Sequence, residues 1–190
     1  KSYIKLKGPI TLHDYMAQCL NHLMHGYYQS KGEVIGEKGD FITAPEVSQL
    51  FGEMIGIWCM STWEQLGRPQ KINLVELGPG KGTLMKDLMG VTSKFSAFKA
   101  AASVHMVELS IPLRKAQYER LRCTGVTDFT DARDAPIFDK DGKIRATVAT
   151  TGIQDSKGYK NADGTLVHWH SFLHQVPTDA PVLIIGSFCS

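Results

Sequence analysis

A glycine-rich turn directly after an apolar run constrains this chain more than any other feature. Residues 72–77 have the composition of a short strand, and apolar residues at helical spacing begin after Gly82. Between them lies the segment Glu76-Leu77-Gly78-Pro79-Gly80-Lys81-Gly82. Glycines permit positive φ and a close approach of the backbone to a ligand, and the start of a helix presents free N–H groups. The segment therefore predicts a nucleotide-type binding corner.

The spacing of the glycines and the nearby acid separate the possible ligands. A dinucleotide fingerprint requires glycine at position 83, where Thr83 stands, and the P-loop pattern is absent. A carboxylate at Glu76 repels a diphosphate but suits a cofactor that carries an ammonium and a sulfonium. The segment resembles the first motif of S-adenosylmethionine-dependent methyltransferases. A nicotinamide oxidoreductase is a distant alternative that Thr83 disfavours, and a plain strand-turn-helix joint is the structural alternative.

Composition and charge narrow the class of protein. The chain has 190 residues, of which 43% are hydrophobic and 21% charged, which is enough for one sizeable core in a globular protein. A formal net charge of +2 and the lack of a block of basic residues give no support to nucleic-acid binding, and no apolar run is long enough for membrane insertion. Cys19, Cys59, Cys123 and Cys189 are scattered, which is typical of unpaired thiols. Because the first residue is Lys1, we expect a processed or recombinant product.

The first seventy residues predict two helices and a binding loop. A helix with Thr11 as N-cap is expected to run to about residue 24 and to pack on the rest of the fold. Residues 26–45 are rich in glycine, and a loop of this length usually binds something. A second helix is expected to start at Pro45, capped by Thr43 or Ala44, and to run to Leu66. Its aromatic residues are predicted to be core: Phe51, Trp58 and Trp63.

Two long motifs carry a family resemblance. They are Gly36-Glu37-Lys38-Gly39-Asp40-Phe41-Ile42-Thr43-Ala44-Pro45-Glu46-Val47-Ser48 and Val75-Glu76-Leu77-Gly78-Pro79-Gly80-Lys81-Gly82-Thr83-Leu84. In this order and at this distance they resemble the MidA-like methyltransferases, over residues from about 8 to 183. The resemblance implies a Rossmann-like methyltransferase fold and S-adenosylmethionine as methyl donor. In the mitochondrial branch of that family it implies arginine methylation of a respiratory complex I subunit, and hence the mitochondrial matrix.

The second predicted strand ends in another acid. Residues 103–108 read as a strand, and a carboxylate at such a strand end can accept hydrogen bonds from both ribose hydroxyls of a nucleoside. Glu108 is predicted for that role, with a solvated strand end as the alternative. Ser110 is expected to cap the following helix, which carries Pro112 in its first turn. The predicted cofactor-binding residues are Asp40, Thr43, Glu76, Gly78, Pro79, Gly80, Gly82, Glu108 and Leu109; Asp40 and Thr43 are carried over from the resemblance alone. No catalytic residue is assigned.

The last third of the chain is less informative. Residues 123–163 suggest a turn-rich, solvated insertion without a calcium site. His168, His170 and His174 could in principle hold zinc, but no carboxylate is specified and a metal is disfavoured. Residues 182–186 predict a buried parallel strand. Relatives in the family continue this strand into an acidic, aromatic segment that this chain lacks, which puts catalysis by this chain in doubt.

Together these observations predict an α/β protein with a Rossmann-like methyltransferase fold, an incomplete parallel sheet and a helical N-terminal extension. Residues 1–70 are expected to form the helical lead with a loop over the cofactor, and residues 71–190 a partial S-adenosylmethionine-binding domain. By resemblance, the function is arginine methylation in complex I assembly, with a shortened form of impaired catalysis as one reading of the chain. The alternative from another class is a non-catalytic scaffold that binds the cofactor and a partner protein.

Overall fold

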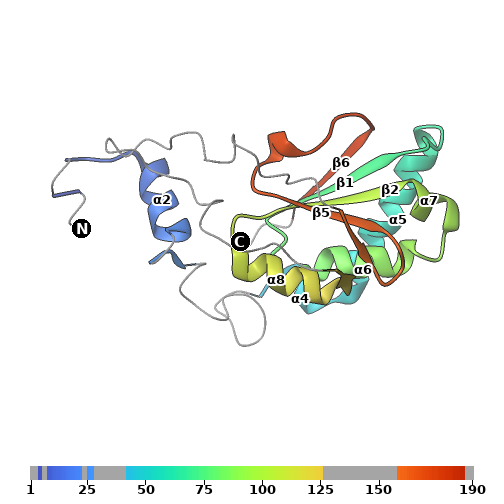
Figure 1. Cartoon of the computed structure of the whole chain (residues 1–190), viewed down its shortest axis with the longest axis horizontal. Helices are drawn as coiled ribbons and strands as arrows, with labels where there is room; N and C mark the ends of the chain where they lie inside the picture. Colours follow the sequence, from blue (N-terminus) through green and yellow to red (C-terminus); the bar gives the residue numbers. More distant parts are fainter. Residues whose placement is uncertain (1–3, 6–7, 23–24, 28–41, 126–157, 187–190) are drawn as a thin grey trace.

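A computed structural model of the chain describes residues 4–5, 8–22, 25–27, 42–125 and 158–186. Within these ranges a six-stranded sheet has the order β3-β4-β5-β2-β1-β6. Its strands are β1 (Ile72–Leu77), β2 (Ala102–Val107), β3 (Cys123–Thr124), β4 (Tyr159–Asn161), β5 (Leu166–His170) and β6 (Val182–Gly186). Figure 1 shows the sheet with helices along it, so the predicted α/β class is confirmed.

The centre of the sheet is parallel, as the sequence predicts. β6, β1, β2 and β5 run in one direction, with Val75 in register with Ile184 on one side and His105 on the other. β4 and β3 are antiparallel additions at one edge, which the sequence did not predict. The local cause is a tight turn, because the side-chain oxygen of Asn161 accepts the backbone N–H groups of Asp163 and Thr165 and folds β4 back onto β5.

The described helices are α2 (Leu12–Asn21), α4 (Ala44–Val47), α5 (Gln49–Gln65), α6 (Thr83–Thr92), α7 (Ser96–Ala101) and α8 (Ile111–Arg120), with a 3-10 turn η3 (Leu173–Gln175). The predicted caps are confirmed, since Thr11 accepts the N–H of Asp14 and Ser110 accepts that of Leu113. The single helix expected from Pro45 onward is wrong, because Ser48 has extended backbone angles that separate α4 from α5. None of these helices is long and apolar enough to cross a membrane.

Two helices lie between the glycine turn and β2. α6 continues to Thr92, and α7 follows it. Phe98 on α7 is buried and packs edge-on against Trp63 of α5. The two helices therefore extend the apolar layer on one face of the sheet.

Helices α5 and α6 pack closely because two glycines of α5 face α6. A Cβ atom at Gly52 would lie 2.7 Å from Cβ of Asp87, and one at Gly56 would lie 2.7 Å from a methyl of Val91. Figure 1 shows the two helices side by side along the sheet. Buried apolar residues of both helices join those of the central strands in one core: Cys59, Trp63, Leu84, Met85, Leu88, Ile72, Leu74, Val104 and Met106.

Three packing expectations are wrong. Trp63 is buried as predicted, but Phe51 is 39% and Trp58 is 52% exposed, so most of the aromatic stripe faces outward. The strand β6 is at the edge of the described sheet, and its Ile184 is 53% exposed rather than buried. α2 lies to one side of the sheet in Figure 1, with its apolar side chains largely exposed, so it is not a packing helix among the described residues. The domain boundary at residue 70 stays a prediction.

Candidate functional site

The predicted glycine turn joins the carboxyl end of β1 to the start of α6. Gly78, Gly80 and Gly82 have φ values of 59°, 54° and 78°, a region that residues with a Cβ rarely adopt. The N–H of Gly82 donates to the carbonyl of Pro79 at 2.8 Å, which closes the turn. A Cβ at Gly82 would also lie only 3.3 Å from Cγ of Gln117. The positive φ values that the sequence predicted are therefore present.

A small pocket opens against this turn. Its volume is about 40 Å³, and its walls come from the turn, from β1 and from the segment around α4. Small-molecule sites typically measure roughly 300–1,000 Å³, so this pocket has room for one end of a cofactor rather than a whole one. The lining residues are Thr43, Pro45, Glu46, Glu76, Gly78, Pro79, Gly80, Lys81, Thr83 and Leu84.

Glu76 is a buried acid on the wall of this pocket. Its side chain is 3% exposed, and its Oε2 atom has no hydrogen-bond partner in the described part of the chain. Burial raises its pKa to about 8, the nearby Glu108 carboxylate adds to the rise, and a hydrogen bond from the backbone N–H of Met85 acts against it. The raised pKa favours the protonated form of Glu76 near neutral pH, and a positive charge beside it would favour the ionised form.

Glu108 lies one residue beyond the end of β2 and does not line the pocket. Its Oε1 accepts the backbone N–H of Ser110 at 2.8 Å, and its own N–H donates to the carbonyl of His170. Burial is the main cause that raises its pKa, against several hydrogen bonds that lower it. Leu109 is half-buried beside it. The carboxylate is turned toward the protein, and its assignment to a ribose stays a prediction.

Gln117 was not among the predicted site residues, and it links the parts of the site. Its amide Nε2 donates to the carbonyl of Gly80 at 2.7 Å and lies 3.5 Å from Oε2 of Glu108, while its Oε1 accepts Nε1–H of Trp169 at 2.8 Å. Gln117 is fully buried. The sequence holds one indication that Gln117 is buried. It lies four residues after Leu113 and four before Leu121, at a helical position where an apolar residue is expected.

The segment before α5 brings further residues to the pocket. Thr43, which the resemblance predicts to bind the cofactor, lines the pocket, whereas Asp40 lies outside the described residues. Glu46 and Lys81 also line it and were not among the predicted binding residues. The histidines considered for zinc lie elsewhere, and the described part of the chain holds no group of three or more metal-ligating side chains.

A family model decides what kind of protein this is. Residues 54–187 match the family described as "Putative S-adenosyl-L-methionine-dependent methyltransferase". The chain belongs to this family. The match covers β1, the glycine turn and both acids, which are the features on which the methyltransferase prediction and its cofactor depended.

Curated relatives of this methyltransferase chain are arginine methyltransferases by name. The mitochondrial protein arginine methyltransferase NDUFAF7 of Xenopus laevis is 39% identical over 92% of this chain and 39% of its own length. The protein of that name from Danio rerio is 43% identical over 98% of this chain and 40% of its own. The protein of that name from Homo sapiens is 38% identical over 92% of this chain and 35% of its own length. The chain thus spans about two fifths of the length of these relatives.

Solved structures agree with the methyltransferase fold. The structure of a COG1565 superfamily member from Burkholderia thailandensis, bound to S-adenosyl-homocysteine, matches this chain with a TM-score of 0.53 and 28% identity. The match covers 63% of this chain and 31% of that one. A native structure of a protein from the same organism has a TM-score of 0.58 over 97% of this chain and 36% of that one, and at 21% identity it shows the fold alone. The predicted Rossmann-like methyltransferase fold is confirmed.

The residues present fit the amino-acid end of such a cofactor. The glycine turn lets the main chain approach, and α6 begins without a side-chain cap. Glu76 lines the pocket, and its buried Oε2 has no hydrogen-bond partner among the described residues. The individual roles of the predicted binding residues stay predictions.

Proposed function

We propose that this chain binds S-adenosylmethionine at the turn between β1 and α6 and forms the cofactor-binding part of a protein arginine methyltransferase. The observation that carries the proposal is Glu76, which lines a pocket beside the glycine turn and whose buried Oε2 has no hydrogen-bond partner in the described part of the chain. An unpaired buried carboxyl oxygen is costly, and a ligand that donates a hydrogen bond to it offsets the cost.

The residues of the chain contribute binding and orientation. The turn at Gly78 and Gly80 leaves room for the amino-acid end of the cofactor, and Glu76 pairs with the positive charge of that end. Glu108 accepts hydrogen bonds from the ribose hydroxyls. When bound, the cofactor would supply a methyl group on a sulfonium for transfer to an acceptor nitrogen, with S-adenosylhomocysteine as the leaving group and the proton of that nitrogen passing to solvent. None of the described residues is assigned to orient the acceptor guanidinium.

The acceptor and the place of action are proposed from the names of the relatives and, for complex I, from the resemblance to the MidA-like methyltransferases. All three NDUFAF7 proteins above are named as mitochondrial arginine methyltransferases. We infer an arginine side chain of a respiratory complex I subunit as the substrate, and the mitochondrion as the compartment. The whole protein's activity belongs to this proposal, because the chain spans about two fifths of those relatives.

Isothermal titration of the chain with S-adenosylhomocysteine tests the cofactor site. The wild-type chain should bind, and Gly80→Val should abolish binding because a β-branched residue is strained at φ 54°. Gly164→Val is the matched control, since Gly164 has φ 84° in the β4–β5 turn with open space around it. Absence of binding by the wild type, or equal binding by Gly80→Val, would refute the proposed site.

Transfer of a radioactive methyl group tests the enzymatic part. Peptides from complex I subunits should be labelled at arginine, and peptides with lysine in place of arginine should not. Binding of S-adenosylhomocysteine without any labelling would favour the non-catalytic scaffold for this chain.

A further inference from the structure

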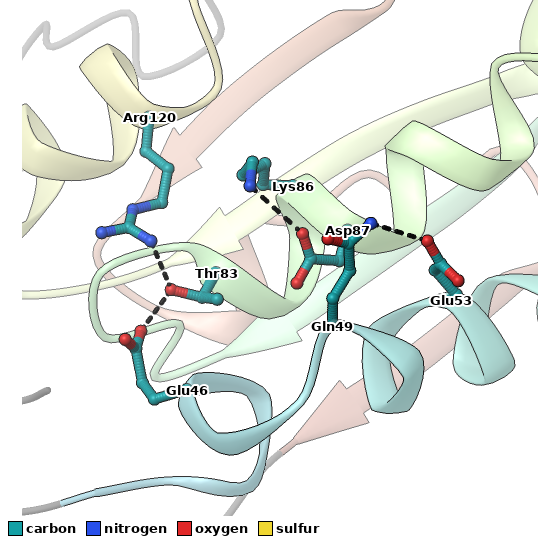
Figure 2. Close-up of polar contacts among 7 residues, drawn as sticks. All are labelled: Glu46, Gln49, Glu53, Thr83, Lys86, Asp87 and Arg120. Atoms are coloured by element: carbon teal, nitrogen blue, oxygen red, sulfur yellow. Dashed lines mark hydrogen bonds and ion pairs between the residues drawn. The ribbon is translucent and has the colours of Figure 1, made fainter.

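A single hydroxyl group ties three helices together beside the pocket. Nη1 of Arg120 on α8 donates to Oγ1 of Thr83 at 2.8 Å, and the Thr83 hydroxyl donates to Oε1 of Glu46 on α4. Figure 2 shows the three side chains meeting at the first residue of α6. They come from positions 37 residues apart at each step, so this is a tertiary arrangement rather than a local one.

This arrangement fixes the orientation of the Glu46 carboxylate. Because Arg120 donates to the Thr83 oxygen, the hydroxyl proton is directed to Glu46. One carboxylate oxygen of Glu46 is thereby held. The other, Oε2, accepts no hydrogen bond from any residue in the ranges that the structure describes. Glu46 is half-buried and lines the same pocket as Glu76.

The two acids give the pocket the acceptors that a primary ammonium requires. An ammonium has three N–H donors and no acceptor. Glu46 and Glu76 both line the pocket, and residues of the glycine turn line it beside them. A sulfonium has no N–H, so its charge attracts these acceptors without donating a hydrogen bond to them. At about 40 Å³ the pocket suits a small charged group rather than an adenosine.

We propose that Glu46 is a specificity-determining residue that binds the α-ammonium of the cofactor, and that Thr83 and Arg120 are positioning residues that aim its carboxylate. This rests on the proposed function, because it names the part of the cofactor that the pocket recognises. The proposal adds Glu46, from the segment before α5, to the acids that bind the amino-acid end of the cofactor. The sequence had predicted only Glu76 on β1 for this end.

Two ligands separate this role from a purely structural one. S-adenosylhomocysteine carries the amino-acid end, and 5′-methylthioadenosine is the same nucleoside thioether without it. Titration of both into wild type and Glu46→Gln should show a loss of about tenfold or more for the first and less than about twofold for the second. Glutamine keeps an oxygen that can accept the Thr83 hydroxyl, so the variant removes charge rather than the contact.

Two further variants complete the design. Thr83→Val removes the hydroxyl that orients Glu46 and should lower the affinity for S-adenosylhomocysteine severalfold while sparing 5′-methylthioadenosine. Glu53→Gln is the matched control, because Glu53 on α5 accepts from Gln49 and does not line the pocket. It should leave both affinities unchanged. If Glu46→Gln fails to fold, the ratio of the two affinities in Thr83→Val distinguishes a binding role from a structural one.

The outcomes are distinct from those of the proposed function. Equal losses for both ligands, or a loss below about threefold for S-adenosylhomocysteine in Glu46→Gln, would overturn the role of Glu46 while leaving the cofactor site in place. A wild-type chain that binds neither ligand would overturn the proposed function itself, and this inference with it.

Discussion

The side-chain amide of Gln117 donates a 2.7 Å hydrogen bond to the main-chain carbonyl of Gly80, so a residue of α8 holds the turn that follows β1. The oxygen of the same side chain accepts Nε1–H of Trp169 on β5. The shape of the turn thus depends on helix and strand residues far from it in the sequence.

Replacement of Gln117 by methionine should weaken both folding and ligand binding. The side chains have similar length, but methionine removes the acceptor that Gln117 gives to Nε1–H of Trp169 and the donor that it gives to the carbonyl of Gly80. We expect a loss of about 1–3 kcal/mol in the free energy of unfolding, measured by urea denaturation, and a weaker titration with S-adenosylhomocysteine. Gln117→Glu keeps the acceptor for Trp169 and loses the donor to Gly80. Should Gln117→Met bind as well as wild type, the turn would not depend on this amide.

The parts of the site that the sequence could predict are those with local causes. Positive φ at Gly78, Gly80 and Gly82 follows from the lack of a Cβ, and the cap at Ser110 follows from a hydroxyl three residues before a free N–H. Strand β1 and its acid were likewise visible in a six-residue window. Each of these features depends on neighbours within a few positions along the chain.

The parts that the sequence could not predict depend on distant partners. Gln117 contacts Gly80, 37 residues away in the sequence. The helical pattern of α8 does not show how closely this helix packs against the turn. The break at Ser48 and the outward position of Trp58 depend on how α5 lies on α6. Helical period alone gives a stripe of large apolar residues, whereas the two glycines of α5 determine which side makes the close contact.

Substitution of Gly52 by alanine should separate α5 from α6. The added Cβ would lie 2.7 Å from Cβ of Asp87 and 3.2 Å from the carbonyl oxygen of Leu84, which is backbone. Crowding of this kind costs about 1–3 kcal/mol, and the better helix propensity of alanine recovers less than about 1 kcal/mol. Thermal melting followed by circular dichroism should show a lower Tm.

Gly90→Ala is the matched control for this packing. Gly90 is in α6 with open space around its Cβ position, so alanine there should raise stability by about 0.5–1 kcal/mol. Two glycine-to-alanine changes on adjacent helices are therefore expected to shift Tm in opposite directions. A rise in Tm for Gly52→Ala would contradict the close approach of the two helices.

The raised pKa of Glu76 makes stability depend on pH. Burial raises it to about 8 in the folded chain against 4.5 for an exposed carboxyl, so the folded state holds this proton more tightly than the unfolded state. Its stabilising contribution is complete below about pH 4.5 and is lost as the pH rises to about 8. Relative to Glu76→Gln, the wild type should lose on the order of a few kcal/mol across that range.

Urea denaturation of both proteins at about pH 5 and about pH 8 measures this difference. Glu64→Gln is the control, since Glu64 is exposed and pairs with Arg68 on the surface, where such pairs contribute little. Parallel pH profiles for wild type and Glu76→Gln would show that Glu76 is not the group responsible. Because a bound cation favours the ionised form, S-adenosylhomocysteine should also release protons on binding, and calorimetry in buffers of different ionisation enthalpy measures this release.

A buried pair of histidines makes the free energy of unfolding depend on pH in the opposite direction from Glu76, and at lower pH. Nδ1 of His105 lies 3.0 Å from Nε2 of His170, and Nε2 of His105 lies 3.3 Å from Oδ1 of Asn73, whose amide donates to the carbonyl of Pro177. Because the Asn73 amide donates to Pro177, Oδ1 of Asn73 accepts Nε2–H of His105, and Nδ1 of His105 then accepts Nε2–H of His170. Nδ1 of His170 is left as a buried acceptor without a partner among the described residues. Both histidines are thereby neutral in the folded chain.

Their pKa values agree with this arrangement. Burial is the largest cause that lowers the pKa of His105 to about 3 and that of His170 to about 4, and the neighbouring His168 adds to both shifts. The unfolded chain takes up these protons near pH 6.5, so the stabilisation is complete above that pH and is lost as the pH falls toward about 3. Acid should therefore unfold the protein partly through these two side chains.

His170→Gln should reduce this acid sensitivity. The glutamine amide can donate to Nδ1 of His105 in place of the ring N–H but takes up no proton. At about pH 7.5 the free energy of unfolding should change by less than about 1 kcal/mol, and between about pH 6.5 and about 4.5 it should fall less steeply than in the wild type, by up to about 1.4 kcal/mol per pH unit. His174→Gln, at an exposed position, should keep the wild-type slope. Identical slopes for His170→Gln and wild type in urea denaturation would show that the pair does not titrate on unfolding as the geometry requires.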